Sequence, residues 1–283
     1  MSEDLSEILL HTPQSIMDEP DPRDHLPNMS RAAANLSIDE MLAMPGLGEF
    51  GVKASNQGRR SSCTLHAGVN GIDMLYGRFW PGEGPSGLSR EGAYNAIRNH
   101  FGRLDKDEGM TSRQMMEGMK EVGLRSSSFW EPDSVFEAPP ADYKDSSIKL
   151  DLGYYKMPTF TDEAGQFAPG TNYSLRMWLQ WIKLERLPIW VSTKIPVGDM
   201  RSSQVRRTGI RGQAFYRSRN EPGYWHREVV ENLSRFPDSR IMVTLLGSWD
   251  EHVGDRGRFH VPWENFLNRY YTGQNHAPKK GLA

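Results

Sequence analysis

A single cysteine stands in a setting that suits nucleophilic chemistry. Cys63 is the only cysteine among 283 residues, and it follows the polar stretch 55–62 at the start of a segment with helical spacing. The thiolate is the reactive form of cysteine, and the unpaired N–H groups of a helix N-terminus favour an anion. Gln57, six residues upstream, could donate an amide N–H to a developing oxyanion. Taken alone, a lone cysteine is more often a small, buried and inert apolar residue.

Helical signals occupy residues 57 to about 137. Apolar residues recur with near-helical spacing in SCTLHAGVNGIDMLYG, and Ser61 or Ser62 can cap its start. LSREGAYNAIRNHFG and TSRQMMEGMKEVGL are predicted to form two further helices. Thr111 and Gln114 have capping-box spacing, and Gly123 stands where a glycine commonly ends a helix.

Strand signals dominate the later part of the chain. LDLGYYKMP, PIWVSTKIP, SRIMVTLLGSW and GRFHVPW are predicted strands, and YSLRMWLQWIKLERL is one more helix. Helices first and strands second predict an α+β protein with two lobes. We expect an extension at 1–50, a helical lobe at 51–140, a β-rich lobe at 141–270 and a tail at 271–283. Within the extension, the amphipathic piece SIDEMLAMPGLGEF could dock on the body.

Composition restricts the partners and the compartment. The net charge of −2 implies no general attraction to nucleic acid or to an anionic membrane. No apolar stretch approaches the roughly 20 residues that cross a bilayer, and the N-terminus lacks the features of a signal peptide, so we expect a cytoplasmic protein. One cysteine excludes an internal disulfide. The sequence contains no metal-ligand cluster, phosphate-binding loop or dinucleotide fingerprint, and we therefore expect no metal and no cofactor.

Several stretches together resemble the papain-like cysteine peptidases, in particular their bacterial, cytosolic-looking branch. Gln57-Gly58, a short loop, Ser62-Cys63 and a helix reproduce the family's pattern with its Gln-to-Cys spacing. LSREGAYNAIRN, DEGMTSRQMMEGMKEVGL, PPADYKDSSIKLDLGYYKMP and GSWDEHVGDRGRFHVP resemble further family segments in the family's order, over roughly residues 55–267. The resemblance implies a helical N-terminal lobe and a β-barrel-like C-terminal lobe with a cleft between them.

The resemblance also implies roles for individual residues. Cys63 matches the nucleophile and Gln57 the oxyanion donor. His226, in EPGYWHREVV, matches the base, and Trp249 matches the tryptophan that shields the histidine's hydrogen bond. His66 lies three residues after Cys63, where we expect a packed, hydrogen-bonded side chain rather than a second base.

The chain departs from the family pattern beside the expected site. Gly247 stands where the family has the asparagine that orients the histidine, and a backbone carbonyl or Ser248 could substitute for it. The bulky pair Tyr224-Trp225 precedes the histidine, where the family has small residues, and Arg227 follows it.

Two functions therefore remain open at this stage. One is a peptidase that hydrolyses peptide bonds of a peptide or protein substrate through a Cys–His pair. The other is an inactive papain-like protein that binds a partner or serves in an assembly. A protein partner could dock on the N-terminal arm or on the arginine-rich stretch 201–219, whose simpler interpretation is a solvated loop.

Overall fold

The computed structural model describes residues 30–81, 87–145, 147–150, 154–156, 172–211, 223–266 and 276–278. The helices in these ranges are α2 (Arg31–Asn35), α3 (Ile38–Ala43), α4 (Cys63–Phe79), α5 (Arg90–His100), α6 (Ser112–Glu121), α7 (Asn172–Leu179), α8 (Val197–Arg201), α9 (Ser203–Thr208) and α10 (Trp263–Asn265). A 3-10 turn, η1, covers Leu47–Phe50, and a π-helical turn, η2, covers Gln180–Leu184. The strands are β1 (Tyr154–Lys156), β2 (Ile189–Pro196), β3 (Gly223–Arg235), β4 (Ile241–Leu246), β5 (Arg258–Pro262) and β6 (His276–Pro278).

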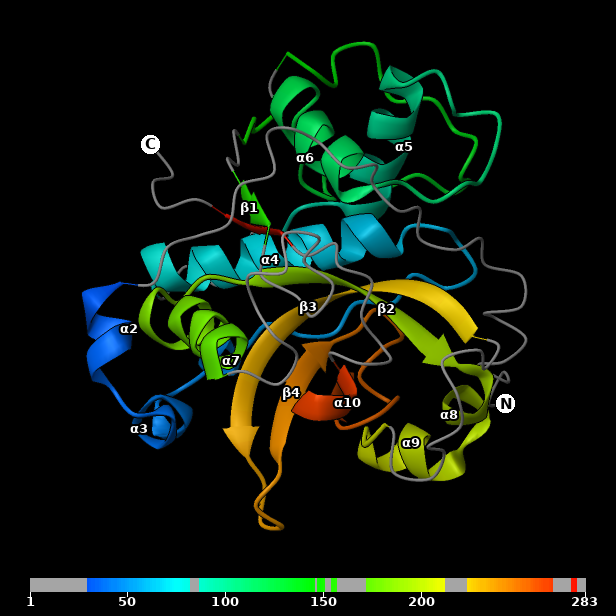
Figure 1. Cartoon of the computed structure of the whole chain (residues 1–283). Coiled ribbons are helices and arrows are strands. Elements are labelled where there is room, and N and C mark those ends of the chain that lie inside the picture. Colours follow the sequence, from blue (N-terminus) through cyan, green and yellow to red (C-terminus); the bar gives the residue numbers. More distant parts are fainter. Residues whose placement is uncertain are drawn as a thin grey trace.

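The six strands form one antiparallel sheet in the order β1-β6-β2-β3-β4-β5. The register of β2 against β3 places His226 opposite Thr193. β3 continues past β2 to pair with β4, and the pairing is irregular between Val230 and Asn232. Such irregularities bend a strand and increase its twist. Figure 1 shows β3 as a long curved strand across the middle of the sheet.

Helix α4 lies between the sheet and the pair α5–α6 (Figure 1). Gly71 permits its close approach, because a Cβ at this position would lie 2.5 Å from Nε1 of Trp190 on β2. The same indole nitrogen donates a hydrogen bond of 3.0 Å to the carbonyl of Ala67 on α4. The helix that begins at Cys63 is thereby fixed on the sheet that carries His226.

The helix-end predictions are largely confirmed. Thr111 and Gln114 form both halves of a capping box on α6, and Gly123 follows with a left-handed φ of 81°. Ser62, one of the two candidate caps, occupies the N-cap of α4, but its side chain caps no amide of the helix. Its hydroxyl instead donates to Glu91 at 2.9 Å, because the folded chain brings this carboxylate within reach.

The described part of the N-terminal extension, residues 30–50, lies against α7 and η2. Arg176 donates to two main-chain carbonyls of this segment, and Lys183 donates to the carbonyl of Met44 at 2.6 Å. These contacts confirm that the amphipathic piece docks on the body. Residues 1–29 lie outside the described part of the chain.

The arginine-rich stretch 201–219 is not a solvated loop over its described part. α8 ends within it, and α9 follows, with the hydroxyl of Ser202 accepting a hydrogen bond from the amide of Val205. Arg211 is buried, with 1% of its surface exposed. The loop prediction is therefore wrong for residues 201–211, because capping and burial were not evident from composition; residues 212–219 lie outside the described ranges.

Candidate active site

Cys63 is the first residue of α4, and only 2% of its surface is exposed. Burial disfavours the thiolate and raises the pKa of the thiol above its ordinary value. A main-chain hydrogen bond from Arg227, the charge of Arg227 and hydrogen bonds from Thr64 act in the opposite direction without outweighing burial. The side chain is therefore a protonated thiol at neutral pH.

The contact with Arg227 joins the start of α4 to the strand that carries the predicted base. Arg227 directly follows His226 in β3, and its main-chain amide hydrogen-bonds to the sulfur of Cys63. The fold thus brings Cys63 beside the His226–Arg227 step of the sheet, although the two segments are far apart in the sequence.

His226 is also buried, with 2% of its surface exposed. Its ring is stacked on the indole of Trp249, with centroids 4.2 Å apart and an interplanar angle of 19°. Burial lowers the pKa of His226 to about 3, and the nearby carboxylate of Glu228 only partly offsets this effect. The imidazole is therefore neutral at pH 7, and Trp249 covers one of its faces.

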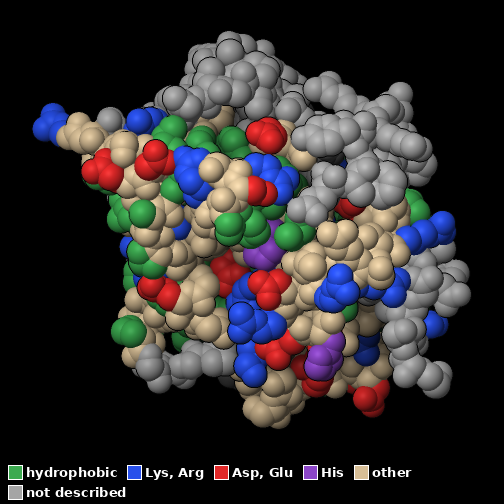
Figure 2. Space-filling view, turned by 90° about the horizontal axis from the view of Figure 1, so that it is seen from below, with side chains coloured by type: hydrophobic (Ala, Val, Ile, Leu, Met, Phe, Trp, Pro, Cys, Tyr) green, Lys and Arg blue, Asp and Glu red, His purple; other side chains and the backbone are tan. Residues whose placement is uncertain are grey.

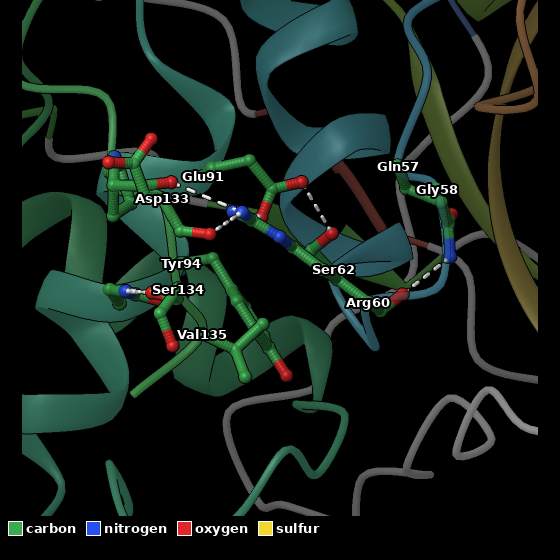
Figure 3. Close-up of polar contacts among 12 residues, drawn as sticks. Gln57, Gly58, Arg60, Ser62, Glu91, Tyr94, Asp133, Ser134 and Val135 are labelled. Carbon is green, nitrogen blue, oxygen red and sulfur yellow. Dashed lines mark hydrogen bonds and ion pairs between the residues drawn. The ribbon is translucent and has the colours of Figure 1, made fainter. Parts of the chain in front are cut away.

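Gln57 lies in a loop that is joined to the segment containing Trp249. The amide of Gln57 donates to the carbonyl of Ser248 at 3.0 Å, and Asn56 forms a β-bridge with Trp249. The side-chain Nε2 of Gln57 donates to the carbonyl of Arg60 at 2.9 Å (Figure 3). With 2% of its surface exposed, Gln57 is turned into the protein and not toward solvent.

Ser248 connects Gln57 with His226. Its hydroxyl donates to Oε1 of Gln57 and lies 3.4 Å from Nε2 of His226. Gly247, where the resemblance places the orienting asparagine, offers no side chain, and a Cβ there would lie 3.0 Å from the ring of Phe259. Ser248 is one of the two substitutes that the sequence left open, and its hydroxyl contacts His226.

A buried ion pair lies next to this site, and its two residues were not among the candidates predicted from the sequence. The guanidinium of Arg211 makes two hydrogen bonds of 2.9 Å to the carboxylate of Glu228, which also accepts from Thr193 at 2.7 Å. Arg211 lies 3.7 Å from the ring centroid of Phe259 and 5.4 Å from that of Trp249. One sequence signal could have indicated Glu228. Side chains two residues apart in a strand lie on the same face, so Glu228 is on the same side of β3 as His226.

A second buried cluster holds the loop in front of α4. His66 contacts Ser55 at 2.7 Å and Glu91 at 2.8 Å through its two ring nitrogens, which confirms that it is packed and hydrogen-bonded. The carboxylate of Glu91 also accepts from Arg60 at 3.1 Å and from Ser62 (Figure 3). The loop that carries Gln57 is therefore anchored to the first turn of α5.

The two bulky residues before His226 are half-buried. Tyr224 packs against the hydrophobic core, and Trp225 lies beneath the ammonium of Lys194, 5.9 Å from its ring centroid. Cys63 and His226 are each about 2% exposed, so little of either side chain is open to solvent.

The described residues contain no group of three or more His, Cys, Asp and Glu side chains placed to hold a metal ion. Within the same ranges, no helix is both long and apolar enough to cross a bilayer. Figure 2 shows basic and acidic side chains interspersed over the face seen from below, rather than one extended basic surface of the kind that binds nucleic acid.

Comparison with solved structures identifies the fold. Xylellain, a cysteine protease from Xylella fastidiosa, matches 96% of this chain and 97% of its own, with a TM-score of 0.67 and 16% identity. The chain has the papain-like fold. The digestive procathepsin L 3 of Tenebrio molitor matches 97% of this chain and 77% of its own (TM-score 0.62, 14% identity), and bromelain from Ananas comosus matches 83% and 97% (TM-score 0.56, 11% identity).

No protein-family model and no curated protein sequence matches the chain. The papain-like fold is therefore recognised from three-dimensional structure. Its helical N-terminal part and antiparallel C-terminal sheet confirm the α+β architecture that the sequence predicts.

Proposed function

We propose that this protein is a cysteine peptidase that hydrolyses peptide bonds with Cys63 as nucleophile and His226 as base. The main-chain hydrogen bond from Arg227 to the Cys63 sulfur carries the proposal, because it sets the thiol beside the step of β3 that bears the imidazole. Gln57 belongs to the same site through its contact with Ser248. The papain-like fold, which cysteine proteases share, supports this reading.

The reaction proceeds by acyl transfer to sulfur. The imidazole takes the thiol proton while the sulfur attacks the peptide carbonyl carbon, and the carbonyl π electrons move to oxygen. Nε2 of Gln57 carries two hydrogens, and only one is needed for the bond to the Arg60 carbonyl, so the second can donate to this oxyanion. The C–N bond then breaks, the leaving amine takes the proton from the imidazolium, and water hydrolyses the thioester.

The charge state of the pair determines how the nucleophile is activated. Burial raises the pKa of Cys63 and lowers that of His226, so the resting pair is a thiol and a neutral imidazole. A neutral imidazole can act as a general base at pH 7. Proton transfer therefore accompanies the attack of sulfur, instead of preceding it in a stable ion pair.

The second candidate is an inactive papain-like binding protein. The near-complete burial of Cys63 and His226 and the missing side chain at Gly247 favour it. In that case the protein would bind a partner without hydrolysing a peptide bond.

Labelling of the single thiol distinguishes the two functions. The purified full-length protein is incubated with an epoxide thiol probe, and its intact mass is measured; because Cys63 is the only cysteine, one mass shift reports one site. Cys63→Ala is the control for probe chemistry elsewhere. A peptidase should be labelled and should also cleave members of a peptide library.

His226→Gln is the matched variant for activation, because it keeps a polar side chain but removes the base. Loss of probe labelling in this variant, with labelling by a small alkylating reagent retained, supports an activated thiol. A wild-type protein that reacts with the small reagent but neither with the probe nor with peptides would be the binding protein of the second candidate.

A further inference from the structure

We propose that Ser55 is a second nucleophile of this protein, activated by His66 and Glu91, and that it accepts the acyl group of small esters with a good leaving group. Ser55 lies in the loop before α4, His66 near the start of α4 and Glu91 in the first turn of α5. This site shares no side chain with the pair of Cys63 and His226, and it does not depend on peptidase activity.

The three side chains form one chain of hydrogen bonds. Nε2 of His66 lies 2.8 Å from Oε1 of Glu91, and Nδ1 lies 2.7 Å from Oγ of Ser55. Both are distances over which a nucleophile, a base and its orienting group can exchange or hold a proton. Because both ring nitrogens of His66 are used in this way, His66 is not a second base for Cys63.

The carboxylate of Glu91 fixes the direction of this chain. Arg60 and Ser62 also donate to it, and its pKa lies below the ordinary value, so it is ionised and can only accept. Nε2 of His66 therefore carries a hydrogen. Burial lowers the pKa of His66, so the ring is neutral at pH 7 and Nδ1 has a lone pair. The hydroxyl of Ser55 donates its proton to this lone pair, as a serine nucleophile does to its base.

Ser55 is held in place by its main chain and is the nucleophilic member of the cluster. Its carbonyl accepts from the amide of Asp250 at 3.0 Å, and the next residue, Asn56, forms a β-bridge with Trp249. Only 2% of the surface of His66 is exposed, whereas Ser55 is half-buried. The base is therefore shielded from water, while the residue that carries the hydroxyl is partly open to solvent.

The reaction at this site is the hydrolysis of an ester in two steps. Oγ of Ser55 bonds to the ester carbonyl carbon while its proton moves to Nδ1 of His66. The bond from carbon to the leaving oxygen then breaks, and the leaving alkoxide takes that proton. Water, deprotonated by the same nitrogen, attacks the acyl-serine, which releases the acid and restores the hydroxyl. Glu91 is the positioning residue, since it acts only through His66.

A fluorophosphonate probe tests the site, because an activated serine oxygen attacks phosphorus and displaces fluoride. The full-length protein is treated with the probe at neutral pH, digested with trypsin and analysed by mass. Cleavage after Lys53 and Arg59 releases residues 54–59, ASNQGR, in which Ser55 has the only hydroxyl. Cys63 falls in a different tryptic peptide, so the two nucleophiles are read separately.

We expect the label on residues 54–59 in the folded wild type and in Cys63→Ala, and its loss in Ser55→Ala and in protein unfolded by urea. His66→Gln should slow labelling about 100-fold, which is the order of magnitude of general-base catalysis. Glu91→Gln should slow it about tenfold. Glu91→Asp, which keeps the charge, should restore part of the rate. In Cys63→Ala, which has no thiol, hydrolysis of 4-nitrophenyl acetate should depend on Ser55.

An unlabelled peptide 54–59 in the folded wild type would overturn the proposal without any variant. Equal labelling rates in the folded and the urea-unfolded protein would do the same, as would an unchanged rate in a folded His66→Gln. The peptidase proposal is tested independently: labelling of Ser55 in a protein that cleaves no peptide supports this site and counts against the peptidase. Peptide cleavage that requires Cys63, with Ser55 unlabelled, refutes the second nucleophile alone.

Discussion

The imidazole of His226 lies flat against the indole of Trp249, with ring centroids 4.2 Å apart. Arg211 also lies over this indole, 5.4 Å from its ring centroid, and pairs with Glu228. Trp249 thus contacts both a neutral histidine and the arginine of a buried ion pair, and both charges of that pair act on the pKa of His226.

Removing the indole should raise the pKa of His226. Burial is the main cause of its depressed pKa, and Trp249→Ala would admit water to one face of the ring. We expect the pKa, followed by NMR titration of the ring, to move from about 3 toward the ordinary value of about 6.5. The truncation should also cost about 3–5 kcal/mol of stability.

Trp249→Phe provides the control for this change, because it keeps an aromatic ring in the same place. The pKa of His226 should remain depressed in this variant. An unaltered pKa in Trp249→Ala would show that other groups exclude water from the imidazole.

The raised pKa of Cys63 predicts the pH dependence of its reactivity. A thiol whose pKa is raised stays protonated above the ordinary value of about 8.5, so simple alkylation should be slow at pH 7 and should still be rising at pH 9. The measurement is the rate of mass increase with a small alkylating reagent between pH 5 and pH 10. A rate that is already constant below pH 7 would indicate a preformed thiolate and contradict the neutral resting pair.

The depressed pKa of His226 predicts loss of stability in acid. The unfolded chain takes up a proton near pH 6.5, whereas the folded ring takes it up only near pH 3, so this contribution is complete above pH 6.5 and falls as the pH decreases toward 3. Between pH 6.5 and 4.5 the loss should be about 2–3 kcal/mol in urea unfolding. His226→Gln should lack this part of the pH dependence. Equal slopes of unfolding free energy against pH in the two proteins would contradict the prediction.

The buried pair of Arg211 and Glu228 should be costly to break. Burial works against the charged form of Glu228, but Arg211 and the other neighbours hold its pKa below the ordinary value. Glu228→Gln leaves the guanidinium buried without a counter-charge, and we expect a loss of about 3–5 kcal/mol in denaturant unfolding.

The double variant Arg211→Met with Glu228→Gln is the matched control for the ion pair. It removes both charges and should be more stable than Glu228→Gln alone. A double variant no more stable than Glu228→Gln would mean that the unpaired charge of Arg211 is not what destabilises the single variant.

Gly247→Asn tests the absence of the orienting side chain. If that absence limits catalysis, an amide at this position should raise peptide turnover or thiol reactivity at neutral pH. The new Cβ would lie 3.0 Å from Phe259, so a stability loss of about 1–3 kcal/mol is also expected. Gly247→Ala introduces the same crowding without the amide, and equal activities of the two variants would show that the amide contributes nothing.

Local signals determined much of the helical part. The capping box of Thr111 and Gln114 is a contact between residues three apart, so it can be read directly from the chain. The same holds for Cys63 at the first position of its helix, which follows from the polar loop and the apolar spacing after it. The order of the segments that resemble papain-like peptidases predicted the papain-like architecture.

Contacts between distant segments could not be determined in this way. The hydrogen bond of Ser248 to Gln57 spans 191 positions, and the pair of Arg211 and Glu228 depends on how a helical segment meets β3. The period of two along β3 indicates which side of the strand Glu228 faces, but no sequence pattern indicates the partner of Glu228 or of Ser248. Arg211 therefore resembled one more solvated arginine until the fold showed it buried.

The sequence by itself determined which residue types were available for chemistry: one thiol, a histidine opening a strand, and a glutamine six residues before the thiol. The tertiary structure decided their state, because pKa values depend on burial and on neighbouring charges brought together by folding. Burial made the thiol and the imidazole neutral. Packing placed the hydroxyl of Ser248 near Nε2 of His226, a nitrogen that Gly247 cannot contact because it has no side chain.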